Sequence, residues 1–186
     1  METRSMTWEE IESRVARFEA LAPMSTPGDL GDLPQQALDV VFARKLMPVI
    51  LEKTKNPFGS TAAIFGAAGT TMNVSVCPPG QGPCLHTHHN TYETFMVLEG
   101  AFEFSVGEQG EERVTLNRWD VFSCPPGVPR GFRNCSDGDS VLLTVITGGV
   151  HERDDVSVPP AVTHRIRDEF GDDTVETFRR IVTMND

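Results

Sequence analysis

The sequence contains no hydrophobic run long enough to cross a bilayer, and its N-terminus lacks the apolar core of a signal peptide. Basic residues are also scarce, since 16 lysines and arginines face 27 acidic residues and the formal net charge is -11. Nucleic acids and anionic membrane surfaces are bound through basic patches, so this balance argues against both kinds of partner. We therefore expect a soluble, cytoplasmic protein that binds neither.

Cysteine is sparse, and its spacing argues against a structural zinc knuckle. The four cysteines stand at positions 77, 84, 124 and 135, and no two form a Cys-x-x-Cys pair. In a reducing compartment we expect free thiols that pack as small hydrophobic side chains. Cys84 is ambiguous because it lies two residues before His86. On a strand it would share the face of that histidine and could ligate a metal, whereas Gly82 and Pro83 favour a loop.

Between residues 61 and 150, short apolar or alternating runs are separated by glycine and proline turns. The run Phe102, Phe104, Val106 alternates with more polar positions, and a Gly107–Gly110 turn follows it. Comparable runs occupy 62–65, 71–77, 93–98, 113–116, 120–124 and 141–146. Short strands at such spacing are typical of an antiparallel sandwich or barrel, so we expect an all-β domain over 61–150.

The flanks of this region differ from it and predict helical extensions at both ends. Residues 1–60 are expected to form a helical or extended arm, in which Thr7 and Glu10 are spaced as a capping box for a helix over 7–21. The apolar stripe of that helix needs a partner surface, either the barrel or a second subunit; its members are Trp8, Ile11, Val15 and Phe18. Residues 151–186 predict short, charged helices.

Three of the five histidines lie within four residues, and a carboxylate follows them closely. His86 and His88 are two residues apart, so on an extended segment both imidazoles point to the same side. His89 is out of phase and is expected to face the other side. With Glu93 added, the set suits a divalent transition metal.

The cluster is part of a longer pattern of spacings. Gly80 is followed by five residues, His86-x-His88, four residues, Glu93, six residues and Gly100. This resembles the first cupin motif, with every signature position filled. About twenty residues later comes Trp119-Asp120-x4-Pro125-x-Gly127-x2-Arg130-x3-Asn134. It resembles the second cupin motif, with Trp119 where glycine is usual and Arg130 where the last histidine is usual.

The resemblance covers roughly residues 60 to 150 and carries expectations of its own. It implies a cupin-like antiparallel β-barrel, also called a double-stranded β-helix or jelly roll, which is often dimeric, so we expect a homodimer. In cupins the first motif supplies two histidines and a glutamate to a metal. Carried onto this chain, that set is His86, His88 and Glu93, and the ion would be iron, manganese, nickel or zinc.

Arg130 leaves two arrangements open. Its guanidinium keeps its proton and offers no lone pair, so it cannot replace the missing histidine as a ligand. In the first arrangement, a metal lies on the three remaining ligands, and Arg130 holds a substrate carboxylate between the two cations. In the second, the site is empty and Arg130 pairs directly with Glu93. The convergence of two histidines favours the metal.

These observations yield three hypotheses for function. The first is a metal-dependent enzyme that acts on a small organic acid, with Arg130 and Glu93 as catalytic residues; a dioxygenase is the reaction class that the family suggests. The second is a binding or sensing protein that holds a small ligand without turnover, which the Arg130 departure supports. The third is a metal-free isomerase or epimerase of the cupin type.

Overall fold

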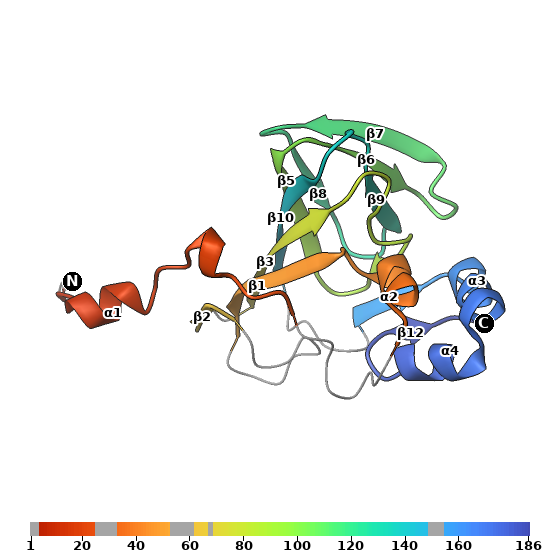
Figure 1. Ribbon diagram of the computed structural model, residues 1–186, viewed down its shortest axis with the longest axis horizontal. Coiled ribbons are helices and arrows are strands. Elements are labelled where there is room, and N and C mark those ends of the chain that lie inside the picture. Colours follow the sequence, from red (N-terminus) through yellow and green to blue (C-terminus); the bar gives the residue numbers. More distant parts are fainter. Residues whose placement is uncertain (1–3, 25–32, 53–61, 67–68, 149–154) are drawn as a thin grey trace.

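Two β-sheets that face each other dominate the computed structural model, which describes residues 4–24, 33–52, 62–66, 69–148 and 155–186 (Figure 1). The larger sheet has the strand order β2 (Ile64–Phe65), β1 (Lys45–Leu51), β3 (Thr70–Cys77), β10 (Ser140–Thr147), β5 (Tyr92–Glu99) and β8 (Val121–Cys124). The smaller sheet has the order β7 (Glu112–Asn117), β6 (Ala101–Val106) and β9 (Arg130–Asn134). The strands within these two sheets pair antiparallel, apart from β1 with β2.

The space between the two sheets is filled by phenylalanines. Phe95 of β5 and Phe102 and Phe104 of β6 are fully buried, since they occupy alternate, inward positions of their strands. The ring of Phe95 lies 4.9 Å from that of Phe104 and 5.5 Å from that of Phe132 on β9, centroid to centroid. Tilted and edge-on ring contacts of this kind tie the two sheets into one core.

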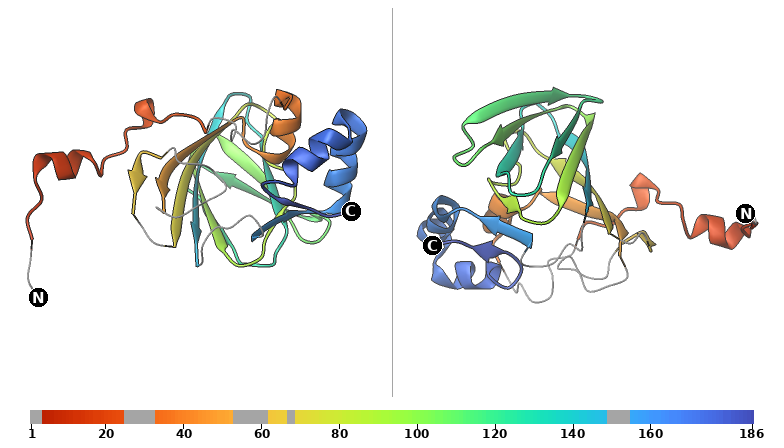
Figure 2. Two further views of the ribbon diagram at one scale, coloured as in Figure 1. Left: turned by 90° about the horizontal axis from the view of Figure 1, so that it is seen from below. Right: turned by 180° about the vertical axis from the view of Figure 1, so that it is seen from behind.

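We call the two facing sheets the barrel. A second apolar core lies outside it and joins distant parts of the chain. Its helices are α2 (Gln35–Val41), α3 (Pro160–Phe170) and α4 (Asp172–Phe178), and its buried members include Val40, Ile166 and Phe178. Figures 1 and 2 show these three helices gathered on one side of the barrel. We call the α2 helix together with residues 155–186 the helical module.

A small third sheet connects the helical module to the barrel. It consists of β12 (Thr183–Met184), β11 (Val156–Val158) and β4 (Thr87–His88). β11 pairs antiparallel with β4, and the residue opposite His88 is Val156. His88, a predicted metal ligand, therefore lies in a sheet whose other two strands come from the C-terminal extension.

The N-terminal arm departs from the predicted helix over 7–21. The capping box of Thr7 and Glu10 is confirmed, but α1 spans only Trp8–Glu12, and a single turn of 3-10 helix follows at Phe18–Ala20. No residue of α1 is buried, and Trp8 is 68% exposed. Short helices gain their stability from packing, and without it the periodic pattern alone does not extend the helix. In both figures the arm runs away from the barrel.

Other expectations fare differently. β1 lies within the segment 1–60 and joins the larger sheet, so the sheet begins earlier than expected, while the boundaries at 60/61 and 150/151 fall outside the described residues. All four cysteines are free, and Cys135 alone among them is exposed. No helix in the described ranges has the length and apolarity needed to cross a membrane.

The unusual Trp119 has a backbone consequence. It lies in the turn between β7 and β8 with a φ of 75°. Among the described residues other than glycine, Trp119 alone has a positive φ. Side chains with a Cβ are disfavoured there by about 1–2 kcal/mol, which explains the usual glycine. The exposed indole stacks under Arg118, 4.7 Å from ring centroid to guanidinium carbon.

We expect the Trp119→Gly variant to be about 1 kcal/mol more stable than the Trp119→Ala variant, because both lose the indole but only glycine relieves the backbone. Chemical denaturation of the two proteins measures this difference. An alanine variant as stable as the glycine variant would show that position 119 does not hold a positive φ in solution.

Candidate metal centre

The two motifs are held together by backbone hydrogen bonds. The amide of His86 donates to the carbonyl of Arg130 at 2.9 Å, and the amide of Arg130 donates to the carbonyl of His86 at 2.9 Å. On one side of this bridge, Phe132 N donates to Pro83 O at 3.3 Å, and on the other side Gly127 N donates to His88 O at 2.7 Å. His86 and Arg130 are therefore cross-strand neighbours, which fixes both side chains at one end of the barrel.

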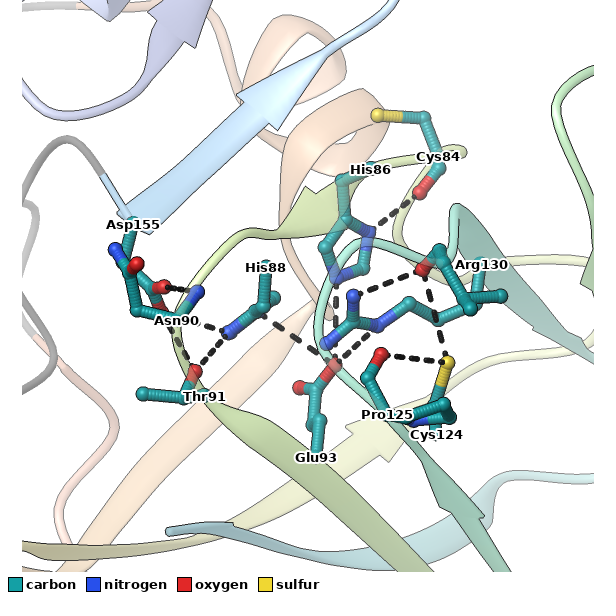
Figure 3. Close-up of polar contacts among 11 residues, drawn as sticks. Cys84, His86, His88, Asn90, Thr91, Glu93, Cys124, Pro125, Arg130 and Asp155 are labelled. Atoms are coloured by element: carbon teal, nitrogen blue, oxygen red, sulfur yellow. Dashed lines mark hydrogen bonds and ion pairs between the residues drawn. The ribbon is translucent and has the colours of Figure 1, made fainter. Parts of the chain in front are cut away.

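Three predicted ligands converge at this end of the barrel. The ligand atoms of His86, His88 and Glu93 all lie within 4.8 Å of one another (Figure 3). Oε2 of Glu93 is 3.5 Å from Nε2 of His86 and 3.6 Å from Nε2 of His88. Two ligand atoms about 2.1 Å from a tetrahedral ion lie about 3.4 Å apart, so this donor set fits a divalent metal.

The other ring nitrogen of each histidine is hydrogen-bonded, which selects the tautomer. Nδ1 of His86 lies 2.8 Å from the carbonyl oxygen of Cys84, and Nδ1 of His88 lies 2.9 Å from Oγ1 of Thr91. A carbonyl oxygen only accepts, so His86 carries its proton on Nδ1. With the protons on Nδ1, both Nε2 atoms present a lone pair on the side of Glu93, as metal ligation requires.

A buried carboxylate that the sequence did not reveal lies behind His88. Asp155 is fully buried, and its Oδ2 lies 3.2 Å from Nδ1 of His88 and accepts from Oγ1 of Thr91 at 2.6 Å. Its Oδ1 accepts from the amide of Asn90 at 2.6 Å. A carboxylate behind a ligating histidine orients the ring and increases its basicity. Asp155 immediately precedes β11, so the C-terminal extension provides this support.

Arg130 makes direct contact with the cluster. Its Nε donates to Oε2 of Glu93 at 2.9 Å, and its Nη1 donates to the carbonyl of Val128 at 3.1 Å. Nη2 is buried without a hydrogen-bond partner among the described residues. The guanidinium is fully buried and does not line the cavity beside the cluster. The direct pair foreseen as the second arrangement is therefore present, together with the metal-ligand geometry, and the substrate-anchoring role of Arg130 stays a prediction.

Charge and burial determine the ionisation of these groups. Burial by itself would raise the pKa of Glu93, but the interactions of its carboxylate with His88, His86 and Arg130 hold that pKa well below its usual range. Burial also lowers the pKa of His88, and the nearby Glu93 opposes this effect only in part. At neutral pH the cluster therefore presents a carboxylate and neutral imidazole, the states that a metal needs.

The cluster opens on a cavity of about 90 Å³ whose wall is largely apolar. His86, His88 and Glu93 lie at its edge, and the helical module contributes Val158 and Val182. Apart from the three ligands, the polar residues of the wall lie on β3 and β10 of the larger sheet, which form the floor of the cavity; they are Asn73, Ser75 and Thr144. A cavity needs about 10–15 Å³ of such volume to hold one water molecule, so this one accommodates several waters or a small organic molecule.

The remaining candidates are placed as follows. His89 is exposed and outside the cluster, as expected, with Nε2 2.8 Å from Oγ of Ser157. Cys84 contributes its carbonyl, while its sulfur is directed away from the three ligands (Figure 3). Burial raises the pKa of this thiol to about 12. Cys84 is therefore outside the ligand set, as the loop interpretation favoured.

Comparison with known proteins gives one family-model match, which falls within the β-sheet region. Residues 73–146 match the sequence model of a family described as Cupin domain. The matched range contains His86, His88, Glu93 and Arg130, and Asp155 lies beyond it. A search of the curated proteins found no match.

Solved structures that match part of this chain include three bacterial proteins. One from Klebsiella pneumoniae, described as having a double-stranded β-helix domain, is 23% identical; 45% of this chain and 70% of that chain are covered, with a TM-score of 0.41. A Thermus thermophilus protein is 28% identical, with 46% and 79% covered and a TM-score of 0.42. A Thermotoga maritima protein, described as a predicted oxalate decarboxylase, is 26% identical, with 41% and 64% covered and a TM-score of 0.38. This chain thus spans less than two thirds of the Thermotoga protein.

We expect Asp155→Asn to weaken metal binding about 10- to 100-fold, because the carboxylate that supports His88 is lost while the side-chain shape is kept. Competition titration against a chelating dye measures the affinity. Asp168→Asn is the matched control, since Asp168 is exposed on α3 and should leave the affinity unchanged. Equal affinities for folded Asp155→Asn and the unmodified protein would contradict the supporting role.

Proposed function

We propose that this chain, whose barrel is a cupin domain, binds one divalent transition metal through His86, His88 and Glu93 and acts on a small organic acid in the adjoining cavity. The all-β cupin-like fold, with helical segments at both ends, is as the motifs led us to expect. The observation that carries the proposal is the convergence of two Nε2 lone pairs and one carboxylate oxygen at the cavity edge.

The reaction class that this ligand set supports best is an oxygenase-type transformation. Two histidines and one carboxylate are the ligands of many non-haem iron oxygenases, and they leave several coordination positions open. When bound, the ion supplies Lewis acidity and those open positions for a small acid. The apolar wall of the cavity keeps bulk water away from a reactive group.

Neighbouring residues fix the charge and the orientation of the three ligands. Glu93 is kept as a carboxylate by its cationic and imidazole neighbours, and Arg130 fixes the position of its Oε2. Thr91 and Asp155 orient His88, and the carbonyl of Cys84 orients His86. This framework is preorganised, because its members are held by hydrogen bonds that do not involve an ion.

A second candidate function, a ligand-binding or sensing protein without bound metal, is favoured by one specific observation. The pair between Arg130 and Glu93 already compensates the buried carboxylate, so the cluster is electrostatically satisfied without an ion. The two candidates differ in whether the purified protein contains metal.

We expect tag-free protein to contain close to one first-row transition metal ion per chain, and His88→Ala to lose it, since a ligand with a buried support is removed. Elemental analysis by mass spectrometry measures the content. His164→Ala is the control, because His164 is exposed on α3 and away from the cluster. Metal-free protein whose stability is unaffected by a chelator would instead favour the binding or sensing function.

We expect Arg130→Met to lower the free energy of unfolding of metal-free protein by about 3–5 kcal/mol, because Glu93 is left as an uncompensated buried charge. The double variant Glu93→Gln/Arg130→Met should recover much of that loss. Added metal should stabilise Arg130→Met more than the unmodified protein, since the guanidinium no longer repels the ion. Denaturant titrations with and without metal test this cycle, and additive losses in the double variant would contradict it.

A further inference from the structure

The floor of the cavity carries a polar group that the proposed function does not use. Asn73 is 3% exposed and lines the cavity, and its Oδ1 has no hydrogen-bond partner among the described residues. A buried, unsatisfied amide oxygen costs about 1–3 kcal/mol, and such a group in a cavity wall is available to a ligand. Its neighbours on the floor, Ser75 and Thr144, are polar too.

The strand register places Asn73 at a defined distance from the metal ligands. Asn73 of β3 pairs with Thr144 of β10, which pairs with Phe95 of β5, and Glu93 is two residues from Phe95 on the same strand face. Two strand spacings and two residues separate the Cα atoms of Asn73 and Glu93 by about 12 Å. Since both side chains face the cavity, a small molecule can reach from the ligand cluster to the amide.

The charges around the cavity limit what that molecule can be. No lysine or arginine is among the described residues that line the cavity, and Arg130 is buried behind Glu93. A divalent ion together with Arg130, Glu93 and Asp155 leaves a single net positive charge, enough for one substrate carboxylate. A second carboxylate at the Asn73 end would be buried without a cation, at a cost of several kcal/mol.

From these observations we infer that the substrate is a monocarboxylic acid with a mainly apolar body and a hydroxyl or similar donor at its far end, which hydrogen-bonds to Asn73. The carboxylate lies at the ligand cluster, and Asn73 selects for the hydroxyl. Dicarboxylates, sugar nucleotides and phosphate esters are rejected because the cavity cannot compensate their charge. This inference rests on the proposed function, because the cluster attracts an anion only when it holds a metal.

The test uses metal-loaded protein and three probes that differ only at one end: hexanoate, 6-hydroxyhexanoate and adipate. Calorimetric titration should show 6-hydroxyhexanoate binding about three- to tenfold more tightly than hexanoate, the effect of one net hydrogen bond. Adipate should bind more than about 100-fold more weakly than hexanoate, the effect of one buried, unpaired carboxylate. Adipate that binds as well as hexanoate, or no binding of any acid, would overturn the inference.

Asn73→Leu supplies the matched variant, since it keeps the volume and removes the amide. The preference for 6-hydroxyhexanoate over hexanoate should disappear in it, and Asn73→Ala serves the same purpose if the leucine variant does not fold. An unchanged preference in either variant would exclude Asn73 as the contact. Because each ratio is measured within one protein, a partial loss of folded material does not affect it.

The metal content of the same samples separates this inference from the proposed function. Protein that binds metal but prefers adipate retains the proposed centre and refutes the substrate class. For metal-free protein, 1-hexanol is the probe, because it needs no cation. Its binding, if lost in Asn73→Leu, supports the Asn73 contact while the metal-dependent function fails, and its failure to bind refutes the contact as well.

Discussion

The centre of this protein is organised by one buried carboxylate oxygen, Oε2 of Glu93. It accepts a hydrogen bond from Arg130 and faces Nε2 of both His86 and His88. A lone carboxylate buried this deeply would take up a proton or destabilise the fold, so its neighbours must supply positive charge or hydrogen bonds. The surrounding architecture meets that need, because the backbone bridge between His86 and Arg130 brings the Arg130 guanidinium to the oxygen that the first motif buries.

The three ligand residues of this centre could be predicted from the sequence. The alternation of extended backbone put His86 and His88 on one side, and the spacing to Glu93 matched a known motif. It also pointed to Trp119, whose positive φ accounts for the glycine usually found there. The relation of Arg130 to Glu93 was foreseen as one of two options, and the direct contact could not be predicted, since side-chain pairing depends on three-dimensional placement.

Other features were beyond local reasoning. Asp155 follows no spacing rule relative to His88, because the two meet through a two-residue pairing of β11 with β4 across more than sixty positions of chain. The helix predicted over 7–21 stops at Glu12 because tertiary packing, which the periodic pattern presupposes, is missing for its apolar residues. The role of Asn73 in the cavity could not be predicted either, because its local sequence is that of an ordinary strand and only the strand register places it in the cavity.

The positive charge of Arg130 has a consequence for how the protein folds. Many small metal sites assemble only around their ion, so folding waits for metal and fails when the supply is short. Here the guanidinium balances the buried acid in the absence of an ion, so folding would not have to wait for metal. The chain can therefore reach its native shape without an ion.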